Sequence, residues 1–447
     1  MAYKIGGQTA EFCHSMKNDI SHLSELVYEG ARTKNLAMTD DVIERIVFEL
    51  EIIETEKFVG YFLLFARIIE ACNELKLLRS HGRGSAMNSM VCYCLDITKI
   101  NPITENLISE RILFKNQIYC PDIDLDIPKD HRQNILKKLK ENHPEYQIYN
   151  IALDTSSERN YREVVLNGRI YKLHPSGLAI TAEALPNQII ICDGENYCIV
   201  DDPKMDKVFW EKVDFAEIEY LNRLQHIVDL IGDEFYPNKI PLDDPDVFNC
   251  FSKGDIENLF QLNDSNLKPF WEEFLPNSIR DLSIINALYR KGSEKFIPEI
   301  IQNKLAGEEL FKMINPLLDS ILEETYGVLI YHEQFMHIQH KMAGFTYTEA
   351  ELWRRRIMHD KNNVAIEHFK TAFAQGCREQ GTADELDVLL ITNMIEKMLP
   401  YIFLKSHSFS YAIIGYWGAY YKTYFREQFD EVFKNKIGFQ PFELHTN

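Results

Sequence analysis

Three aspartates spaced two residues apart form the stretch of the sequence best suited to chemistry. Residues 121–127 are Pro-Asp-Ile-Asp-Leu-Asp-Ile, so Asp122, Asp124 and Asp126 alternate with aliphatic side chains. A β-strand sends successive side chains to opposite faces, which would put three carboxylates on one face and leave the aliphatic face for a core. Like charges this close favour a bound cation, and oxygen-only ligands suit Mg²⁺. A solvated strand face is the plainer alternative.

A glycine-rich segment upstream predicts a phosphate-binding element. Gly82, Arg83, Gly84 and Ser85 precede an apolar stretch of helical character that continues to Leu95. Glycines let the backbone approach a ligand closely, and a serine where a helix begins offers a hydroxyl and free N–H groups to a phosphate. Taken alone, the motif fits a plain glycine turn before a helix equally well.

The composition predicts a globular protein that stays in a reducing compartment. The chain has 447 residues, 45% of them hydrophobic, which predicts two or three subdomains. We find no apolar run that could span a membrane and no secretory signal. Nine cysteines without paired spacing predict buried thiols and a cytoplasmic location. The net charge of −20 argues against broad non-specific nucleic-acid binding, but it leaves room for a local basic groove.

Periodicity places helices ahead of the acidic strand and along most of the C-terminal half. Apolar residues at helical spacing predict helices around residues 23–27 and 43–53, with Asp40 and Asp41 as caps of the second. The apolar run 58–65 fits either a buried strand or the buried start of a helix. A turn-rich segment, 237–245, predicts a subdomain boundary before a mostly helical remainder.

Taken in order, these motifs resemble the catalytic core of the C-family DNA polymerases, the alpha subunits of bacterial DNA polymerase III. That family has G-R-G-S-A, E-R-F and P-D-I-D-x-D-F elements, and this chain has GRGSA at 82–86, Glu110-Arg111, and PDIDLD at 121–126. Downstream, HPSGLAI at 174–180 resembles H-A-x-G-V-V-I, and KVDF at 212–215 resembles K-F-D-F.

The resemblance continues through the helical half of the chain and covers residues 22–429. Segments similar to motifs of the family's fingers domain lie at 254–262, 281–290, 322–334, 349–356 and 405–412. Several positions depart from the family pattern. The family's Y-R-P-G-P is Tyr-Arg-Lys-Gly-Ser at 289–293, and Asn88, Gln117 and Leu404 replace a glycine, a basic residue and an asparagine. These departures suggest specialised or slow chemistry.

The resemblance implies a set of site residues. It assigns the catalytic and metal-binding carboxylates to Asp122, Asp124 and Asp214, with two Mg²⁺ ions as cofactors and Asp126 in support. The expected contacts to the nucleotide or to the template backbone are Arg83, Gly84, Ser85, Arg111, Lys212, Arg354, Arg355, Lys405 and His407. Because three consecutive helical residues cannot share one side, one arginine of 354–356 is expected to be solvated.

The resemblance also implies the fold. We expect an α+β fold in which a polymerase-β-like nucleotidyltransferase palm carries a reduced thumb and a largely α-helical fingers domain. The expected division is a helical lead-in at 1–40, the palm at 41–128 and 173–245, a shortened thumb at 129–172, fingers at 246–430 and a tail at 431–447. No PHP, clamp-binding or OB domain is expected.

The expected activity is a template-directed DNA polymerase that adds deoxynucleotides to a primer 3′-hydroxyl by a two-metal mechanism. Its expected partners are primed template DNA and dNTPs, with clamp and exonuclease functions on separate proteins and no membrane. Two alternatives stay open. The short thumb segment and altered fingers motifs fit an untemplated nucleotidyltransferase. The acidic charge and missing domains fit a catalytically inactive binding module of a replication, repair or defence complex.

Overall fold

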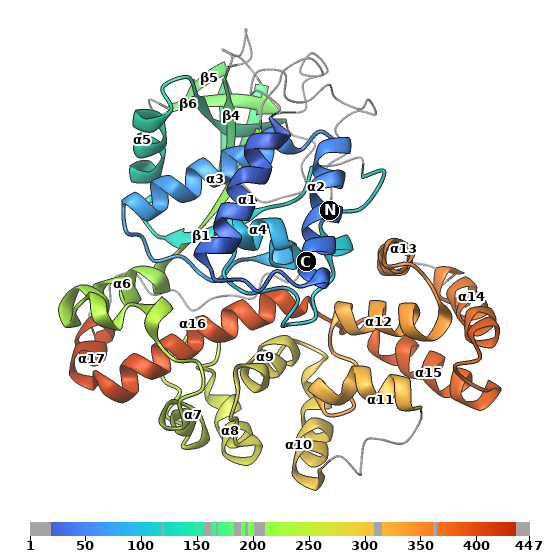
Figure 1. Cartoon of the computed structure of the whole chain (residues 1–447). Helices are drawn as coiled ribbons and strands as arrows, with labels where there is room; N and C mark the ends of the chain where they lie inside the picture. The colour runs from blue at the N-terminus through green and yellow to red at the C-terminus, as the bar shows by residue number, and fades with distance from the viewer. Residues whose placement is uncertain are drawn as a thin grey trace. The chain divides into compact units, whose positions relative to one another are not determined.

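The computed structural model describes residues 19–117, 120–154, 162–166, 169–182, 189–192, 195–200, 211–307, 315–360 and 364–434. The chain forms two compact units. The first unit is Met1–Glu105 with Ile112–Asn222, and the second unit is Asn106–Arg111 with Arg223–Asn447. Figure 1 shows the helices and strands of both units with the labels used here. The chain therefore leaves the first unit for a short excursion at 106–111, returns, and leaves again after residue 222.

The first unit is built on a mixed sheet of seven strands. They are β1 Asp124–Pro128, β2 Gln147–Asp154, β3 Arg162–Leu166, β4 Arg169–Thr181, β5 Ile189–Cys192, β6 Glu195–Val200 and β7 Glu211–Ile218. Their order is β1-β7-β4-β2-β6-β5, and β3 pairs with β4. Residues 129–172, where the sequence predicts a shortened thumb, supply α5 (Arg132–Asn142), β2, β3 and the start of β4, so this segment is part of the same sheet.

The pairing of β1 with β7 brings together two motifs that are far apart in the sequence. The two strands are parallel, and Asp124 lies opposite Asp214. On the other side of β7, β4 runs antiparallel, with Gly177 opposite Asp214. Residues opposite each other on neighbouring strands share a face and are about 5 Å apart. The register therefore places both aspartates on one face, with a glycine beside them.

Five helices and the aliphatic face of β1 form the core of the first unit. The helices are α1 Ile20–Thr33, α2 Asp40–Thr55, α3 Val59–Glu74, α4 Met90–Cys94 and α5, and α1 packs against α2, α3 and α4 (Figure 1). Ile123, Leu125 and Ile127 are 1%, 3% and 0% exposed and belong to the same buried cluster as the helices. The prediction that the acidic stretch buries its aliphatic side is confirmed.

The local predictions for the helices differ from the structure at their ends. The ambiguous apolar run 58–65 is helical, and it is apolar all round because α3 is buried on nearly every side of this turn. Thr39, not an aspartate, is the N-cap of α2. Asp40 and Asp41, predicted as caps, lie in the first turn, where their negative charge interacts favourably with the positive end of the helix dipole and stabilises the helix.

A buried carboxylate on α2 fixes the segment that follows the glycine motif. Glu49 is fully buried and accepts hydrogen bonds from Ser89 Oγ at 2.6 Å and from the backbone N–H groups of Met90 and Val91, both at 2.9 Å. Arg45 donates to Glu49 at 2.8 Å and also to the carbonyl of Asn88 at 2.7 Å. Glu49 therefore caps α4 from another helix and holds the backbone just after residues 82–85.

The second unit is helical in its described part. Its helices are α7 Pro245–Ser252, α8 Lys268–Phe274, α9 Ile279–Leu288, α10 Ile297–Ala306, α11 Pro316–Leu322, α12 His332–Ala343, α13 Tyr347–His359, α14 Val364–Gln380, α15 Glu385–Met398, α16 Lys405–Tyr424 and α17 Arg426–Lys434. The division between the units falls inside α6 (Glu219–Ile231), ahead of the turn-rich segment 237–245. A helical unit beside a unit with a mixed sheet fits the predicted α+β class.

The described residues also bear on the predictions about thiols and membranes. The cysteines of the described segments are free thiols, and most are buried, although Cys120 is exposed. Across the same segments, no helix combines the length and the apolar character needed to cross a membrane.

The cap made by Glu49 can be tested through stability. We expect Glu49→Gln to lower the free energy of unfolding by about 2–4 kcal/mol, because an amide nitrogen would face N–H donors and leave buried groups unpaired. Urea denaturation followed by circular dichroism measures the loss. Glu51→Gln is the matched control, since Glu51 is an exposed carboxylate of the same helix, 3.5 Å from Lys115, and should change stability by less than about 0.5 kcal/mol. Equal stability of Glu49→Gln and wild type would contradict the cap.

Candidate active site

Three carboxylates converge at one edge of the sheet. One oxygen from each of Asp122, Asp124 and Asp214 lies within 4.8 Å of the others. Asp122 is exposed, whereas the side chains of Asp124 and Asp214 are 29% and 14% exposed. The predicted trio is therefore assembled, half-buried at its base and open on one side. Among the described residues it is the one group of this kind in which three or more His, Cys, Asp or Glu side chains meet at ligand distance.

The trio fits a divalent cation of the Mg²⁺ type. All its ligand atoms are carboxylate oxygens, which is the ligand class that Mg²⁺ prefers, and the open side leaves room for waters and phosphate oxygens. Burial, the charge of Asp122 and, to a smaller extent, that of Asp214 raise the pKa of Asp124 to about 7. Arg83 and Lys212 lower the pKa of Asp124 without cancelling these effects, and a bound cation would favour the ionised form further.

Two cations from the chain partly offset the negative charge. Lys212 Nζ lies 2.5 Å from Asp214 Oδ2. Burial opposes the charge on Lys212, but Asp214 outweighs that effect and raises the pKa of the lysine. Arg83 lies on the other side, 3.1 Å from Asp126 Oδ1 and 3.6 Å from Asp124 Oδ2. Both residues, predicted as phosphate contacts, are thus brought to the aspartates.

Asp126 differs from its two neighbours in the motif. Its side chain is buried, and its contact with Arg83 holds the guanidinium beside the trio. It does not belong to the group at ligand distance. Asp126, expected to support the other two aspartates, therefore orients the side chain of Arg83.

An irregular stretch of β4, the strand paired with β7, positions the carboxylate of Asp214. Ser176 Oγ donates to Asp214 Oδ1 at 3.2 Å. His174 Nδ1 accepts N–H bonds from Gly177 at 2.7 Å and from Ser176 at 3.3 Å, so Nδ1 carries no proton and His174 is the Nε2–H tautomer. The 3.8 Å separation of His174 Nδ1 from Asp214 is therefore not an ion pair. A Cβ at Gly177 would lie 2.9 Å from His174 Nδ1, which is why this position of β4 needs glycine.

The glycine motif forms a short 3₁₀ turn and not the start of an α-helix. Gly84–Asn88 is 3₁₀-helical, and Gly84 has a φ of +60°, with open space where a Cβ would lie. The N-terminus of α4 comes later and is already filled by Glu49. Gly84 and Ser85, predicted as phosphate contacts, therefore lie in the 3₁₀ turn beside Arg83 and not at the N-terminus of an α-helix.

Three of the remaining candidates gather in the second unit around one buried glutamate. Glu351 Oε1 accepts hydrogen bonds from Arg111, Arg354 and Arg355 at 2.8, 2.8 and 2.6 Å. Arg354 also donates to Oε2 at 2.7 Å. Burial alone would raise the pKa of Glu351, but the arginines, Arg111 first, lower it to about 2. Arg111, predicted as a contact to the nucleotide or the template backbone, belongs to the helical unit through the excursion at 106–111.

The other candidates of the second unit lie on α16 and α13. Lys405 is buried and pairs with Glu324 at 2.5 Å. His407 packs against Tyr411, with ring centroids 4.2 Å apart. Arg356 is exposed beside Trp353, which confirms that one arginine of the triplet lies on the solvent side. Lys405 and Arg354 are each held by a carboxylate, so a nucleotide contact from either would compete with an existing ion pair.

Glu49, Ser176 and Glu351 are supporting residues to which the sequence analysis gave no role. Glu49 had a signal, because it occupies a position between Ile46, Leu50 and Ile53 that the helical period assigns to the apolar face. Ser176 and Glu351 lie inside recognised motifs, but only the three-dimensional contacts show what they hold.

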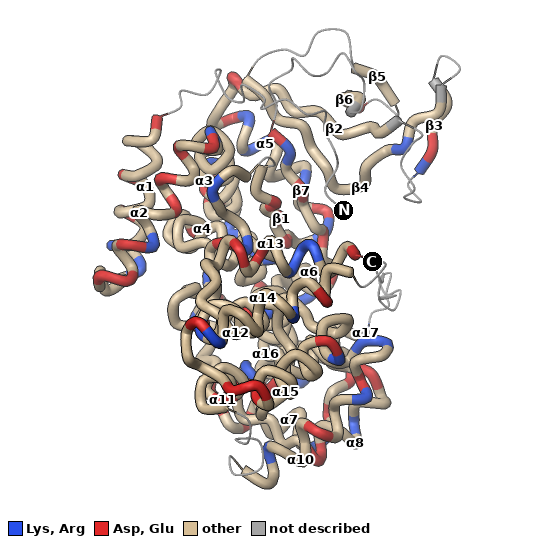
Figure 2. The backbone as a smooth tube through the Cα atoms, turned by 90° about the vertical axis from the view of Figure 1, so that its right-hand side faces the viewer, with Lys and Arg blue, Asp and Glu red and all other residues tan. Residues whose placement is uncertain are grey.

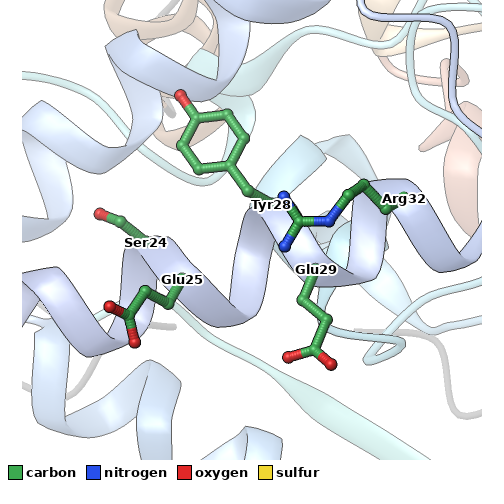
Figure 3. A pocket seen from close by; sticks show the side chains of 5 residues that line it. All are labelled: Ser24, Glu25, Tyr28, Glu29 and Arg32. Atoms are coloured by element: carbon green, nitrogen blue, oxygen red, sulfur yellow. The ribbon is translucent and has the colours of Figure 1, made fainter.

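A pocket lies on α1, lined by Ser24, Glu25, Tyr28, Glu29 and Arg32 (Figure 3). All five side chains come from one helix face, and none belongs to the trio or its supports. We assign it no part in the chemistry.

Comparisons with known proteins show to which family the chain belongs. A family model for the bacterial DNA polymerase III alpha NTPase domain matches residues 21–224, and one for the finger domain of the same subunit matches residues 220–381. The chain belongs to the family of bacterial DNA polymerase III alpha subunits. The junction of the two matches falls in α6, the helix in which the two compact units also divide.

Curated relatives named DNA polymerase III subunit alpha match most of the chain. The protein from Halalkalibacterium halodurans is 28% identical over 95% of this chain, that from Bacillus subtilis 26% over 90%, and that from Staphylococcus aureus 28% over 91%. The aligned part is 44%, 42% and 44% of those proteins, so the chain spans less than half their length.

Removing one charge of the trio should stabilise the metal-free protein. The folded state favours neutral Asp124 because its pKa is raised to about 7, while an unfolded aspartate ionises near pH 4. Wild type should therefore lose stability as pH rises from about 4 to 7, and Asp124→Asn should not. At pH 8 in EDTA we expect Asp124→Asn to be more stable by about 2–4 kcal/mol, measured by urea denaturation. Mg²⁺ should stabilise wild type alone. Equal pH profiles for the two proteins would contradict the charge repulsion.

Loss of the hydroxyl that orients Asp214 should weaken metal binding. We expect Ser176→Ala to lower affinity for Mn²⁺, used as a spectroscopic substitute for Mg²⁺, by roughly tenfold in electron paramagnetic resonance titrations. Ser176→Thr keeps the hydroxyl and should bind nearly as wild type. Ser21→Ala, at an exposed position of α1, is the control for a serine-to-alanine change. An affinity of Ser176→Ala within twofold of this control would exclude the positioning role.

Proposed function

We propose that this chain is a template-directed DNA polymerase that extends a primer 3′-hydroxyl with deoxynucleotides. The observation that carries the proposal is the assembly of Asp122, Asp124 and Asp214 within 4.8 Å, in a chain whose family is that of the DNA polymerase III alpha subunits. A fold retired from catalysis would have no need to retain three mutually repelling carboxylates. This supports an enzyme over a catalytically inactive binding module.

The residues of the first unit would divide the work of phosphoryl transfer among them. Such a reaction needs positioning and charge neutralisation more than acids and bases. Asp122, Asp124 and Asp214 would hold two Mg²⁺ ions, and bound Mg²⁺ supplies activation of the primer hydroxyl and neutralisation of the phosphoryl oxygens. Ser176 keeps Asp214 oriented throughout.

The triphosphate would lie against the turn at Gly84 and Ser85. The open space at Gly84 admits a phosphate oxygen close to the backbone, and Arg83 brings a guanidinium that Asp126 already orients. Lys212 compensates Asp214 in the absence of metal. With a metal ion bound to Asp214, the ammonium group of Lys212 would be able to turn to the triphosphate.

The helical unit would supply the nucleotide's other contacts. Arg354 and Arg355 are held by Glu351, which limits their conformations before a nucleotide arrives and reduces the entropy lost on binding. In this proposal Arg111, Lys405 and His407 complete the same face. A base would be chosen by pairing with the template, so side chains would contact mainly the backbone of the DNA.

The parts of the fold then take the names used for polymerases. We assign the palm, of the polymerase-β-like nucleotidyltransferase type, to residues 41–128 and 173–245, a shortened thumb to 129–172 and the fingers to 246–430. Primed template DNA and dNTPs would be the substrates, and clamp and exonuclease functions would come from other proteins.

Primer extension tests the proposal. The purified chain is incubated with a 5′-labelled primer on a template, Mg²⁺ and dNTPs, and products are resolved on a gel. We expect wild type to add the complementary nucleotide at each template base. The double variant Asp122→Asn/Asp124→Asn should lower the rate of extension by much more than 100-fold. Loss of a residue that only supports a metal ligand costs up to roughly 100-fold, and this variant removes two ligands themselves.

The controls separate the alternatives. Asp229→Asn with Asp246→Asn makes the same charge change at two exposed aspartates and should leave extension intact. Addition of every nucleotide regardless of template would favour the untemplated nucleotidyltransferase. A folded wild-type protein that binds primed DNA and makes no product would contradict the polymerase assignment and favour the inactive binding module.

A further inference from the structure

Three cations of the second unit, Arg290, Lys295 and Lys397, face aromatic rings, and an exposed fourth, Lys291, is next to Arg290 in the sequence. Arg290 lies 4.2 Å from the ring centroid of Phe403. Lys295 Nζ lies 4.1 Å from the ring centroid of Tyr401, and Lys397 Nζ lies 5.3 Å from that of Phe296. These contacts are continuous, because Lys295 also faces the ring of Phe296 and the rings of Phe296 and Tyr401 are 5.4 Å apart. We call Arg290, Lys291, Lys295 and Lys397 the cation cluster.

The loop that carries two of these cations is fixed in place. Arg290 donates to the carbonyls of Ala287 at 2.8 Å and Tyr401 at 2.7 Å. Gly292 has a φ of +93°, and a Cβ there would lie 3.1 Å from the Tyr401 ring, so the backbone packs against that ring. Lys295 Nζ donates to the Tyr401 hydroxyl at 2.9 Å. Tyr401 therefore holds the loop from both sides, and the lysines project from a rigid base.

The cluster is unusual for this chain because it lacks acidic partners. In the described segments no carboxylate pairs with any of the four cations. By contrast, Lys304, Lys370 and Lys422 of the same unit pair with Asp281, Glu396 and Asp255 at 2.6–2.7 Å. Figure 2 shows how generally acidic and basic residues are interspersed along the second unit. Two acids are sequence neighbours of the cluster, Glu294 beside Lys295 and Glu396 beside Lys397. Glu396 is paired with Lys370, so Glu294 is the one neighbouring acid that could offset the positive charge.

One member of the cluster marks a departure from the family. Where the family motif is Y-R-P-G-P, this chain has Lys291 and Ser293 in place of the two prolines. Lys291, Lys295 and Lys397 are exposed, whereas Arg290 is half-buried, and burial lowers its pKa without a carboxylate to oppose the effect. An acidic chain has thus added a positive charge where positive charge is already uncompensated.

We propose that the cation cluster is a binding site for the phosphodiester backbone of a nucleic-acid strand. Exposed ammonium groups without acidic partners attract phosphates and release their counterions, and rings that hold the stems of the lysines keep the charges in place. The site rests on the proposed function, since a polymerase must hold a polyanion while its active site moves along it. It would give an acidic protein local affinity for DNA that its net charge opposes.

The salt dependence of DNA binding tests the site without any catalysis. Anisotropy of a labelled 30-nucleotide single strand is measured at several salt concentrations in EDTA. We expect Lys291→Ala with Lys295→Ala and Lys397→Ala to make the slope of log K against log salt shallower by ~2, and to weaken binding roughly tenfold at 0.1 M salt. Lys→Arg at the same three positions should restore wild-type binding, which excludes loss of folding as the cause.

A charge-matched variant provides the control. Lys115, Lys137 and Lys434 are exposed, and each lies within 4.0 Å of a carboxylate. Their triple alanine variant carries the same net charge and should bind as wild type. If the cluster variant matches this control while wild type extends primers, the cluster has no such role and the polymerase proposal stands. If wild type neither binds DNA nor extends primers, both fall. Equal competition by polyglutamate would overturn the assignment to nucleic acid.

Discussion

The parallel pairing of β1 with β7 is the constraint on which the candidate site depends. It places Asp124 opposite Asp214, and Asp122, which lies just ahead of β1, reaches the same group. A shift of one residue in this register would turn Asp214 into the core and expose Val213 and Phe215. Because both faces of β7 are committed, one to the helices and one to the acids, the core enforces a charge arrangement that is unfavourable in itself.

Carboxylates with different surroundings in this chain separate structure from chemistry. Glu49 and Glu351 are surrounded by donors, four polar contacts in the first case and three arginines in the second, so each stabilises the groups around it. The three carboxylates of the trio face two cations, Arg83 and Lys212, and burial together with the charge of Asp122 raises the pKa of Asp124. An acid that has its full set of donors organises the fold, whereas acids that lack them are suited to a cation.

The sequence was informative wherever a short period or a motif determined the outcome. The alternation in 121–127 predicted which side of β1 is buried, and the triplet at 354–356 predicted that one arginine would face solvent. Register, tautomer and partner choice depend on long-range contacts and could not be predicted. The motifs predicted Arg111 as a contact to the nucleotide or the template backbone, but they did not indicate the excursion at 106–111 in which Arg111 pairs with Glu351. The run 58–65 stayed ambiguous because a helix buried all round has no period.

The connections between the two units explain why the candidate site cannot be assigned to one continuous piece of sequence. The turn at 82–85 precedes the excursion, and the strand with Asp124 follows it. The two parts of the site are therefore separated in the sequence by a segment that the Arg111–Glu351 pair anchors in the second unit. The same glutamate holds Arg354 and Arg355. A change at Glu351 would therefore act on Arg111, Arg354 and Arg355 together. The excursion is thus anchored within the second unit by the same buried charge that holds two arginines of α13.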